Sequence, residues 1–297
     1  MPKILDQLVR VSKQTPCPVC GHDSWCLVSK DGRKALCPRR KSSKKYEGRN
    51  GLIGYLHYTA GAPLPFTSTG KKTYLTTPQV KEYLHHCNHD QPYPMLKHHA
   101  HKLGVTVKSL KAFRCTYDGQ LAALVAPMFN GQREPVGCRC RRTDGRKFSL
   151  KGGREGVFIP LEFQAARPIV IAEGLSDAAA VYDVVSRNVI GRPSCLGGVV
   201  AIRELINEHA PVMILADPDD PGVDGAQDLA VRLPNPTIVI TLAEKETDFR
   251  EYVSLPNLKS KTKRVIIDTL NGIEDLGFNI VFRNQRAACF DFGKVFK

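Results

Sequence analysis

The sequence predicts an α/β fold in which a parallel sheet has helices on both faces, preceded by a basic α+β segment and an N-terminal cysteine-rich module. Three observations support this. Strand-like apolar runs alternate with helical patterns between residues 168 and 241, four cysteines cluster between residues 17 and 37, and a net charge of +14 is densest over residues 1–50. The 297 residues are 42% hydrophobic, enough for a core. No apolar run reaches the roughly 20 residues that span a bilayer.

The N-terminal cysteines follow the pattern C-x2-C-x5-C-x10-C, formed by Cys17, Cys20, Cys26 and Cys37. The first pair has the spacing at which two thiolates hold one tetrahedral Zn²⁺. An Asp-Gly turn between two short strand-like pieces predicts a hairpin that brings Cys26 and Cys37 together. His22 competes with Cys26 as the third ligand, and four free buried cysteines are the remaining alternative. With so few large apolar residues, this module is expected to need a structural zinc ion.

Residues 51–113 begin with a linker rich in Gly, Ser, Thr and Pro and continue as a helical segment. Thr106 is placed to cap a helix that carries Leu110 and Phe113. The helical segment is rich in histidine, but it contains no H-E-x-x-H motif. We therefore favour a basic helical face over a second metal site. The histidines concerned are His85, His86, His89, His98, His99 and His101.

Strand-like runs at residues 168–172, 212–216 and 237–241 are separated by helical patterns at residues 175–185 and 223–233. This β-α-β-α-β order predicts a parallel sheet with helices on both faces. Functional side chains of such sheets lie at the carboxyl ends of the strands.

Carboxylates stand at two of these ends. Glu173 follows the first run, Asp217 follows the second, and Asp219 is two residues further on and points the same way as Asp217. Three unpaired acids at close range would repel one another, so the arrangement favours divalent cations, and hard oxygen ligands suit Mg²⁺ or Mn²⁺. The alternative is an ordinary acidic turn, because Asp, Pro and Gly are common turn residues.

The two acidic motifs, E-G-x-x-D and D-x-D-x-x-G, together resemble the TOPRIM domain of bacterial-type (DnaG-like) primases, type IA and type II topoisomerases and some nucleases. The resemblance covers residues 167–255. It implies a Rossmann-like TOPRIM domain in which Glu173, Asp217 and Asp219 hold the catalytic Mg²⁺ or Mn²⁺, with Asp177 supporting them. Asp248 resembles a weaker acidic position of the family.

Residues 114–166 contain strand-like pieces rich in basic residues and resemble the basic subdomain that precedes TOPRIM in primases. Alternation along a strand places Arg139 and Arg141 on one face, which suits phosphate binding. A solvated basic strand is the alternative. The residues expected to bind nucleic acid or nucleotide are Arg139, Arg141, Arg142, Lys147 and Lys151.

The expected domain order is a zinc ribbon for DNA recognition (1–50), a linker and helical segment (51–113), a basic subdomain (114–166), a TOPRIM domain (167–255) and a C-terminal helical element (256–297). This order resembles the primases of phages, plasmids and bacteria. Two features depart from that pattern. Arg40 stands where a second C-x2-C would place a cysteine, and no helicase follows.

The resemblance implies a DNA primase that synthesises short RNA primers on a single-stranded DNA template during replication. It would use ribonucleoside triphosphates, structural Zn²⁺ and catalytic Mg²⁺ or Mn²⁺, and it would work with a separate replicative helicase. We expect no membrane association and a location in the cytoplasm of a bacterium or phage-infected host. The alternatives are a TOPRIM nuclease that cleaves DNA or RNA, and a non-catalytic zinc-ribbon DNA-binding replication protein.

Overall fold

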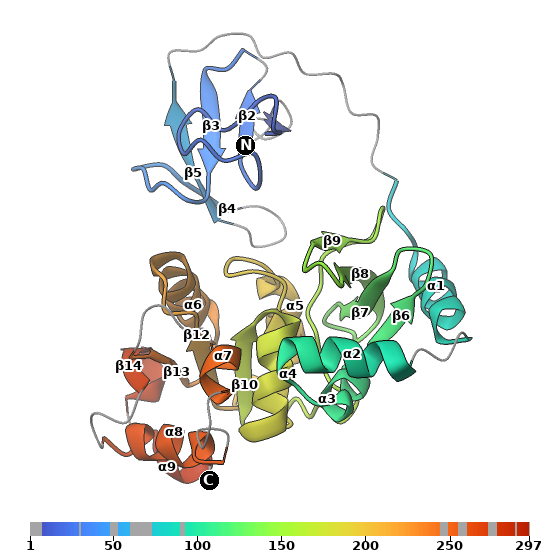
Figure 1. Ribbon diagram of the computed structural model, residues 1–297. Coiled ribbons are helices and arrows are strands. Elements are labelled where there is room, and N and C mark those ends of the chain that lie inside the picture. Colours follow the sequence, from blue (N-terminus) through green and yellow to red (C-terminus); the bar gives the residue numbers. More distant parts are fainter. Residues whose placement is uncertain are drawn as a thin grey trace. The chain divides into compact units, whose positions relative to one another are not determined.

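A computed structural model (Figure 1) describes residues 8–29, 31–47, 53–59, 73–89, 93–243, 249–254, 260–272, 278–288 and 290–296. The chain divides into two compact units, Met1–Lys72 and Thr73–Lys297, and each is described by itself. Among the described helices, none combines the length and the apolar character needed to cross a bilayer.

The N-terminal unit is built on an antiparallel sheet with strand order β1-β2-β3-β5-β4. The predicted hairpin is confirmed, because Leu27 pairs with Leu36 and Val28 with Ala35. Strand β5 pairs with both β3 and β4, so the sheet continues past the expected module end at residue 50. The strands are β1 (Leu8–Arg10), β2 (Leu27–Ser29), β3 (Lys34–Cys37), β4 (Lys45–Glu47) and β5 (Ile53–Tyr58).

The second unit opens with helices α1 (Thr77–His89), α2 (Tyr93–Leu103) and α3 (Val107–Ala112). The predicted cap of α3 is confirmed, since the hydroxyl of Thr106 accepts the N–H of Ser109. An antiparallel sheet in the order β6-β7-β8-β9 follows, and α1 packs on one of its faces (Figure 1). Its strands are β6 (Thr116–Asp118), β7 (Ala123–Phe129), β8 (Pro135–Arg142) and β9 (Lys147–Ser149).

The rest of this unit surrounds a sheet with the order β11-β10-β12-β13-β14, in which the first four strands are parallel. The predicted parallel sheet is therefore present, but β11 and α5 add a strand and a helix that the sequence patterns did not indicate. The elements are β10 (Ile169–Glu173), α4 (Gly174–Val184), β11 (Val189–Arg192), α5 (Val199–Leu205), β12 (Val212–Ala216), α6 (Asp220–Arg232) and β13 (Thr237–Leu242).

The C-terminal part differs from the expected helical element. Helices α7 (Phe249–Ser254), α8 (Thr262–Leu270) and α9 (Phe292–Val295) are present, but β14 (Phe278–Arg283) is a strand that pairs antiparallel with β13. Its Phe-Asn-Ile-Val-Phe sequence is rich in the β-branched and aromatic side chains that fit a pleated sheet. The helical element expected over residues 256–297 is therefore interrupted by a strand, and the sheet continues past residue 255.

Helices cover both faces of the parallel sheet. Since successive residues of a strand point to opposite sides, each strand contributes side chains to two cores. Val170 and Ala172 of β10 pack in a core with α4, α7 and α8, while Ile169 and Ile171 pack in a second core with α5 and α6. The segment of Val157 and Phe158 forms bridges to both sheets of this unit. The carboxyl ends of β10 and β12 meet at one edge of the sheet, where both acidic motifs begin.

Candidate metal centre and carboxylate site

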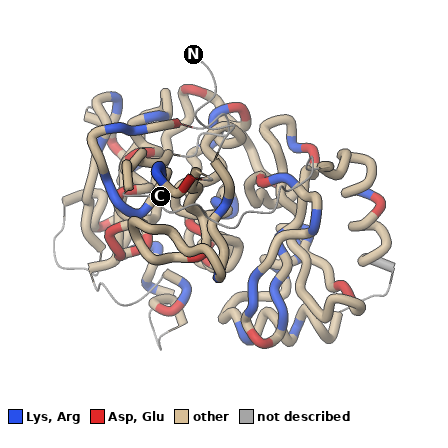
Figure 2. The backbone as a smooth tube through the Cα atoms, turned by 90° about the horizontal axis from the view of Figure 1, so that it is seen from above, with Lys and Arg blue, Asp and Glu red and all other residues tan. Residues whose placement is uncertain are grey.

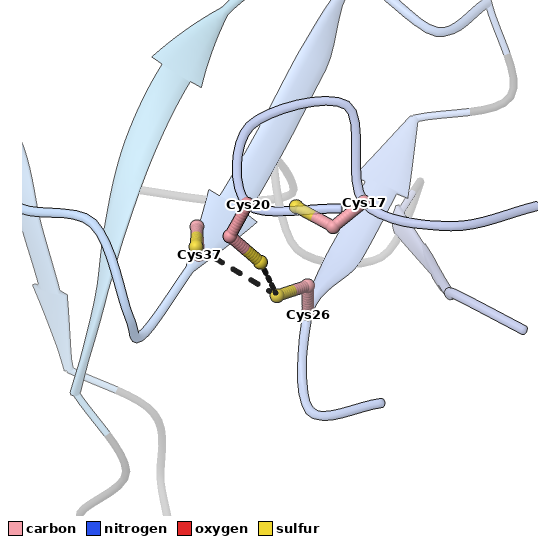
Figure 3. A group of neighbouring side chains, drawn as sticks. All are labelled: Cys17, Cys20, Cys26 and Cys37. Carbon is pink, nitrogen blue, oxygen red and sulfur yellow. Dashed lines mark hydrogen bonds between the residues drawn. The ribbon is translucent and has the colours of Figure 1, made fainter. Parts of the chain in front are cut away.

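The four N-terminal cysteines point toward one another (Figure 3), and all their sulfur atoms lie within 4.8 Å. The Sγ of Cys26 is 3.6 Å from that of Cys20 and 3.7 Å from that of Cys37. A tetrahedral site with Zn–S bonds of about 2.3 Å places its sulfurs about 3.8 Å apart. The donor set and its spacing therefore fit a structural zinc ion.

Local backbone geometry forms this cluster. The chain turns tightly over residues 17–21, where the N–H of Gly21, directly after Cys20, donates to the carbonyl of Cys17 and Gly21 adopts the left-handed conformation with φ +74°. Cys26 and Cys37 come from the β2–β3 hairpin, and Arg39 donates to the Sγ of Cys26 at 3.6 Å. His22 is exposed and stands outside the group of four sulfurs.

The carboxylates gather at the edge of the parallel sheet. Glu173 ends β10, Asp217 directly follows β12 and Asp177 lies in the first turn of α4. All three line one small pocket, together with Thr241 and Phe249. The two acidic motifs, forty residues apart in sequence, therefore contribute to one site.

Asp219 has a structural task in the same motif. Its Oδ1 accepts the N–H of Gly222 at 2.8 Å and caps the N-terminus of α6. A Cβ on Gly222 would lie 2.7 Å from this Oδ1 and from the carbonyl of Asp217, so only glycine fits without a shift. The D-x-D-x-x-G spacing is thus explained by the turn that it forms.

Burial is the main cause that raises the pKa of Glu173 above the ordinary carboxyl value. The negative charge of Asp219 raises this pKa further, while Arg192 and the backbone N–H of Cys195 lower it by favouring the charged form. Glu173 is therefore held among opposing charges. Its proton affinity depends on how those neighbours are placed.

The carboxylates form a looser group than the cysteines. Among the described residues, the four cysteines are the only set of three or more His, Cys, Asp or Glu side chains whose ligand atoms all lie within 4.8 Å. Mg²⁺ is commonly bound through one or two carboxylates together with water and substrate phosphates. The oxygen donors of Glu173 and Asp217 fit that mode of binding.

A basic face of the antiparallel sheet borders this site. In register, Arg139 pairs with Ser149 and Arg141 with Lys147, so the three basic side chains share one face. Arg139 donates to the Ser149 hydroxyl at 3.1 Å and to the Pro193 carbonyl at 3.2 Å. The shared face predicted for Arg139 and Arg141 is present, and the second bond ties it to the loop that follows β11.

Lys147 links the basic face to the acids. Residue 147 as a whole is exposed, but protein atoms around the ammonium group lower the pKa of Lys147, and Arg141 lowers it further. Asp177 opposes this shift, and the charge of Lys147 in turn acts on Glu173. Basic residues elsewhere are spread along the chain (Figure 2). What distinguishes Lys147 is its electrostatic interaction with both acids.

Several residues that the sequence predicts as site residues lie apart from the acids and from the basic face. Arg142 lies on the opposite face of β8, over the ring of Phe148, and Lys151 is exposed in the turn after β9. Asp248 lies outside the described residues. The histidines of α1 and α2 form no three-ligand cluster within the described part of the chain. Of these, His99 is buried.

Three neighbours of the site were not anticipated. Arg192 ends β11 beside Glu173, Cys195 follows it in the next loop, and Arg250 on α7 interacts electrostatically with Lys147. The sequence carries one signal for them. Arg192 closes the otherwise apolar run Val-Ile-Gly-Arg, which is unusual for a buried strand.

Solved structures similar to this chain include the DnaG catalytic core, with 13% identity over 60% of this chain and 75% of that chain at a TM-score of 0.47. The Aquifex aeolicus primase, with its zinc-binding and RNA polymerase domains, shares 16% identity over 89% and 82% of the two chains at 0.47. The primase fragment of the bacteriophage T7 primase-helicase protein shares 15% over 90% and 96% at 0.38. No known family model and no curated protein matches the sequence. At these identities and TM-scores the similarity by itself assigns no activity.

Proposed function

We propose that this chain is a DNA primase, an enzyme that synthesises short RNA primers on single-stranded DNA by metal-dependent nucleotidyl transfer. One observation carries the proposal. The carboxylates of Glu173 and Asp217 come from adjacent parallel strands and line one pocket, and the basic side chain of Lys147 interacts electrostatically with Glu173. Acids for a metal and cations for phosphates are thus combined at one place.

In this proposal residues 167–255 are a TOPRIM catalytic domain. Glu173, Asp217 and Asp219 would hold Mg²⁺ or Mn²⁺, with Asp177 supporting them from α4. When bound, the ion supplies Lewis-acid activation of the primer 3′-hydroxyl and neutralises charge on the attacked phosphate and the leaving pyrophosphate. The fold's own contribution is to fix the carboxylates on rigid strand ends and to keep them partly away from water.

The basic face completes the proposed reaction site. Arg139, Arg141 and Lys147 would bind the phosphates of the ribonucleoside triphosphate and of the DNA template. The planar guanidinium of Arg141 suits paired phosphate oxygens, whereas Lys147 acts as a point charge. Arg142 and Lys151 would serve as more distant contacts to the nucleic acid backbone.

The cysteine module fits a zinc ribbon that recognises the template, with Cys17, Cys20, Cys26 and Cys37 as ligands of a structural Zn²⁺. The basic residues around the module suit a polyanion. We further propose a separate replicative helicase as the partner and the cytoplasm of a bacterium or phage-infected host as the location.

A nuclease is the second candidate, because the same acids and metals cleave phosphodiesters in TOPRIM nucleases. The basic face beside the acids favours synthesis, since a polymerase must bind the triphosphate of each incoming nucleotide as well as the template. A DNA-binding replication protein without catalysis would have no use for carboxylates gathered in one pocket.

The test is incubation of the purified protein with single-stranded DNA, labelled ribonucleotides and Mg²⁺ or Mn²⁺, with all products resolved on one gel. The wild type is expected to make short labelled RNA, and Glu173→Gln is expected to lose it by about 10³-fold or more. Glu208→Gln, a change at an exposed residue on the same unit, should behave like the wild type. Shortened DNA without new RNA would instead establish the nuclease, and neither product would refute both enzymes.

A further inference from the structure

Arg192 is a buried cation beside the proposed metal ligands. Only 3% of its surface is exposed. It lies in register with Glu173 on the neighbouring parallel strand, so both side chains point to the same face of the sheet, and their charges attract. A buried arginine is costly unless its hydrogen-bonding groups are satisfied. Its partners should therefore reveal what it does.

Those partners are two backbone carbonyls from different elements. The Nε of Arg192 donates to Gly197 in the β11–α5 loop at 3.2 Å, and Nη1 donates to Gly225 in helix α6 at 3.2 Å. The guanidinium fork therefore joins the loop of residues 193–198 to the helix whose N-terminus Asp219 caps.

The loop and the helix are also in close contact at Gly225. A Cβ added there would lie 2.3 Å from the carbonyl oxygen of Cys195, so the contact requires glycine. The backbone of Cys195, in turn, lowers the pKa of Glu173 by favouring the charged form of its carboxylate. Arg192 thus joins the loop to helix α6 by hydrogen bonds, and it lies in register with the last residue of β10.

We propose that Arg192 is a positioning residue for the carboxylate site. Its guanidinium, in register with Glu173, joins the 193–198 loop to α6, so that the first and second acidic motifs keep a fixed spacing before a divalent cation binds. The inference rests on the proposed metal-dependent function of this site. It assigns to Arg192 no contact with substrate.

Two roles of Arg192, a charge that repels cations and a group that positions the site, predict opposite changes in metal affinity when its side chain is removed. A positive charge beside Glu173 competes with a cation, so its loss would strengthen metal binding if charge were all that mattered. If Arg192 positions the site, its loss weakens metal binding, as outer-shell changes do by about 10–100-fold. The sign of the change in affinity therefore tests the inference.

The experiment is a Mn²⁺ titration of the purified full chain without DNA or nucleotide, in which free Mn²⁺ is followed by its electron paramagnetic resonance signal. Arg192→Met is expected to bind about tenfold more weakly than wild type or worse. Arg192→Lys keeps the charge but cannot span both carbonyls, so an intermediate loss is expected. Arg203→Met, at an exposed position on α5, is the matched control and should bind like the wild type.

Gly225→Ala provides a variant that alters no charge. Its methyl group pushes α6 away from the 193–198 loop, and several-fold weaker Mn²⁺ binding is expected. If Arg192→Met lacks a cooperative thermal transition, Arg192→Lys and Gly225→Ala decide the question. Unchanged or stronger binding in the folded variants would overturn the inference, as would a wild type whose Mn²⁺ binding survives Asp217→Asn.

Primer synthesis is recorded separately with the same proteins. A wild type that binds Mn²⁺ through Asp217 but makes no RNA refutes the proposed primase, while the binding series still decides the role of Arg192. A wild type that makes RNA and an Arg192→Met protein that binds Mn²⁺ normally would refute only the positioning role.

Discussion

The two candidate sites depend on their folds in opposite ways. In the N-terminal unit the site is the core, because three of the residues in its buried cluster are the cysteines Cys17, Cys26 and Cys37. In the second unit Glu173 and Asp217 stand at the ends of strands whose preceding residues belong to two large apolar cores. A fold that is built around its metal ligands is therefore lost with the site, whereas a site at the edge of an independent core can be changed without loss of the fold.

The largest expected effect is a loss of folding in the N-terminal unit. Cys26→Ser removes one of four thiolates, and metal binding supplies about 10–16 kcal/mol in zinc-finger peptides at neutral pH, so we expect loss of zinc and unfolding of the Met1–Lys72 unit. The Thr73–Lys297 unit should remain folded. Metal analysis and limited proteolysis measure both effects.

His22→Ala is the control for this change, since His22 is exposed and outside the cluster. It should retain zinc and resist protease like the wild type. The opposite pattern, with zinc lost in His22→Ala and kept in Cys26→Ser, would make His22 the third ligand.

A smaller effect is expected when the pH is lowered, because His99 is buried in the second unit. Burial, and after it the charges of His98, Arg141 and Lys102, lowers the pKa of His99 to about 4. Above pH 6.5 the side chain is neutral in both states and contributes nothing. As the pH falls from about 6.5 to about 4 the unfolded chain binds the proton first, so stability is lost, by an amount on the order of 1–3 kcal/mol.

His99→Phe should remove this loss of stability, because phenylalanine binds no proton. The fold should tolerate the change, because Nε2 of His99 finds no hydrogen-bond partner among the described residues. The measurement is the Tm of wild type and variant from pH 7 to pH 4, with His101→Phe, at an exposed position on the same helix, as control. Parallel curves for wild type and His99→Phe would exclude His99 as the source. A chelator should leave this difference unchanged if the second unit is independent of zinc.

The smallest expected effect has the opposite sign. Asp217→Asn removes one charge from carboxylates that share a pocket, so without divalent metal it should stabilise the second unit by about 1 kcal/mol or less, although the proposed primer synthesis would be lost. Thermal unfolding measures this gain, with Glu208→Gln as the exposed control. A clear loss of stability would mean that Asp217 supports the fold as well as the site.

Features formed by nearby residues could be predicted from sequence. The β2–β3 hairpin depends on a local turn, the strand at residues 212–216 is a short apolar run bounded by Pro and Asp, and Thr106 caps a helix within its own turn. In each case the interaction partners lie within a few residues, so pattern and propensity act in the same direction.

Features formed by distant residues could not. Strand β11 has only four residues and ends in Gly191-Arg192, a pair that is as typical of a turn as of a strand. Its extended conformation depends on pairing with strand β10. Strand β14 lies in the segment for which the sequence predicts a helical element, and it forms a strand because the edge of β13 offers it backbone hydrogen bonds. The same applies to the site. The positions of the acids could be predicted from their motifs. The positioning role proposed for Arg192 depends on its hydrogen bonds to Gly197 and Gly225, which no sequence pattern indicates.

The bridging segment of Val157 and Phe158 has a consequence for how this protein can be divided. Val157 exchanges backbone hydrogen bonds with Phe129 of the antiparallel sheet, and Phe158 exchanges them with Gly191 of the parallel sheet. A chain cut near residue 160 would leave exposed strand edges on both fragments, which invite aggregation. A cut between Lys72 and Thr73 separates two compact units. Exchange of modules with other proteins should therefore succeed at that boundary and fail between the two sheets.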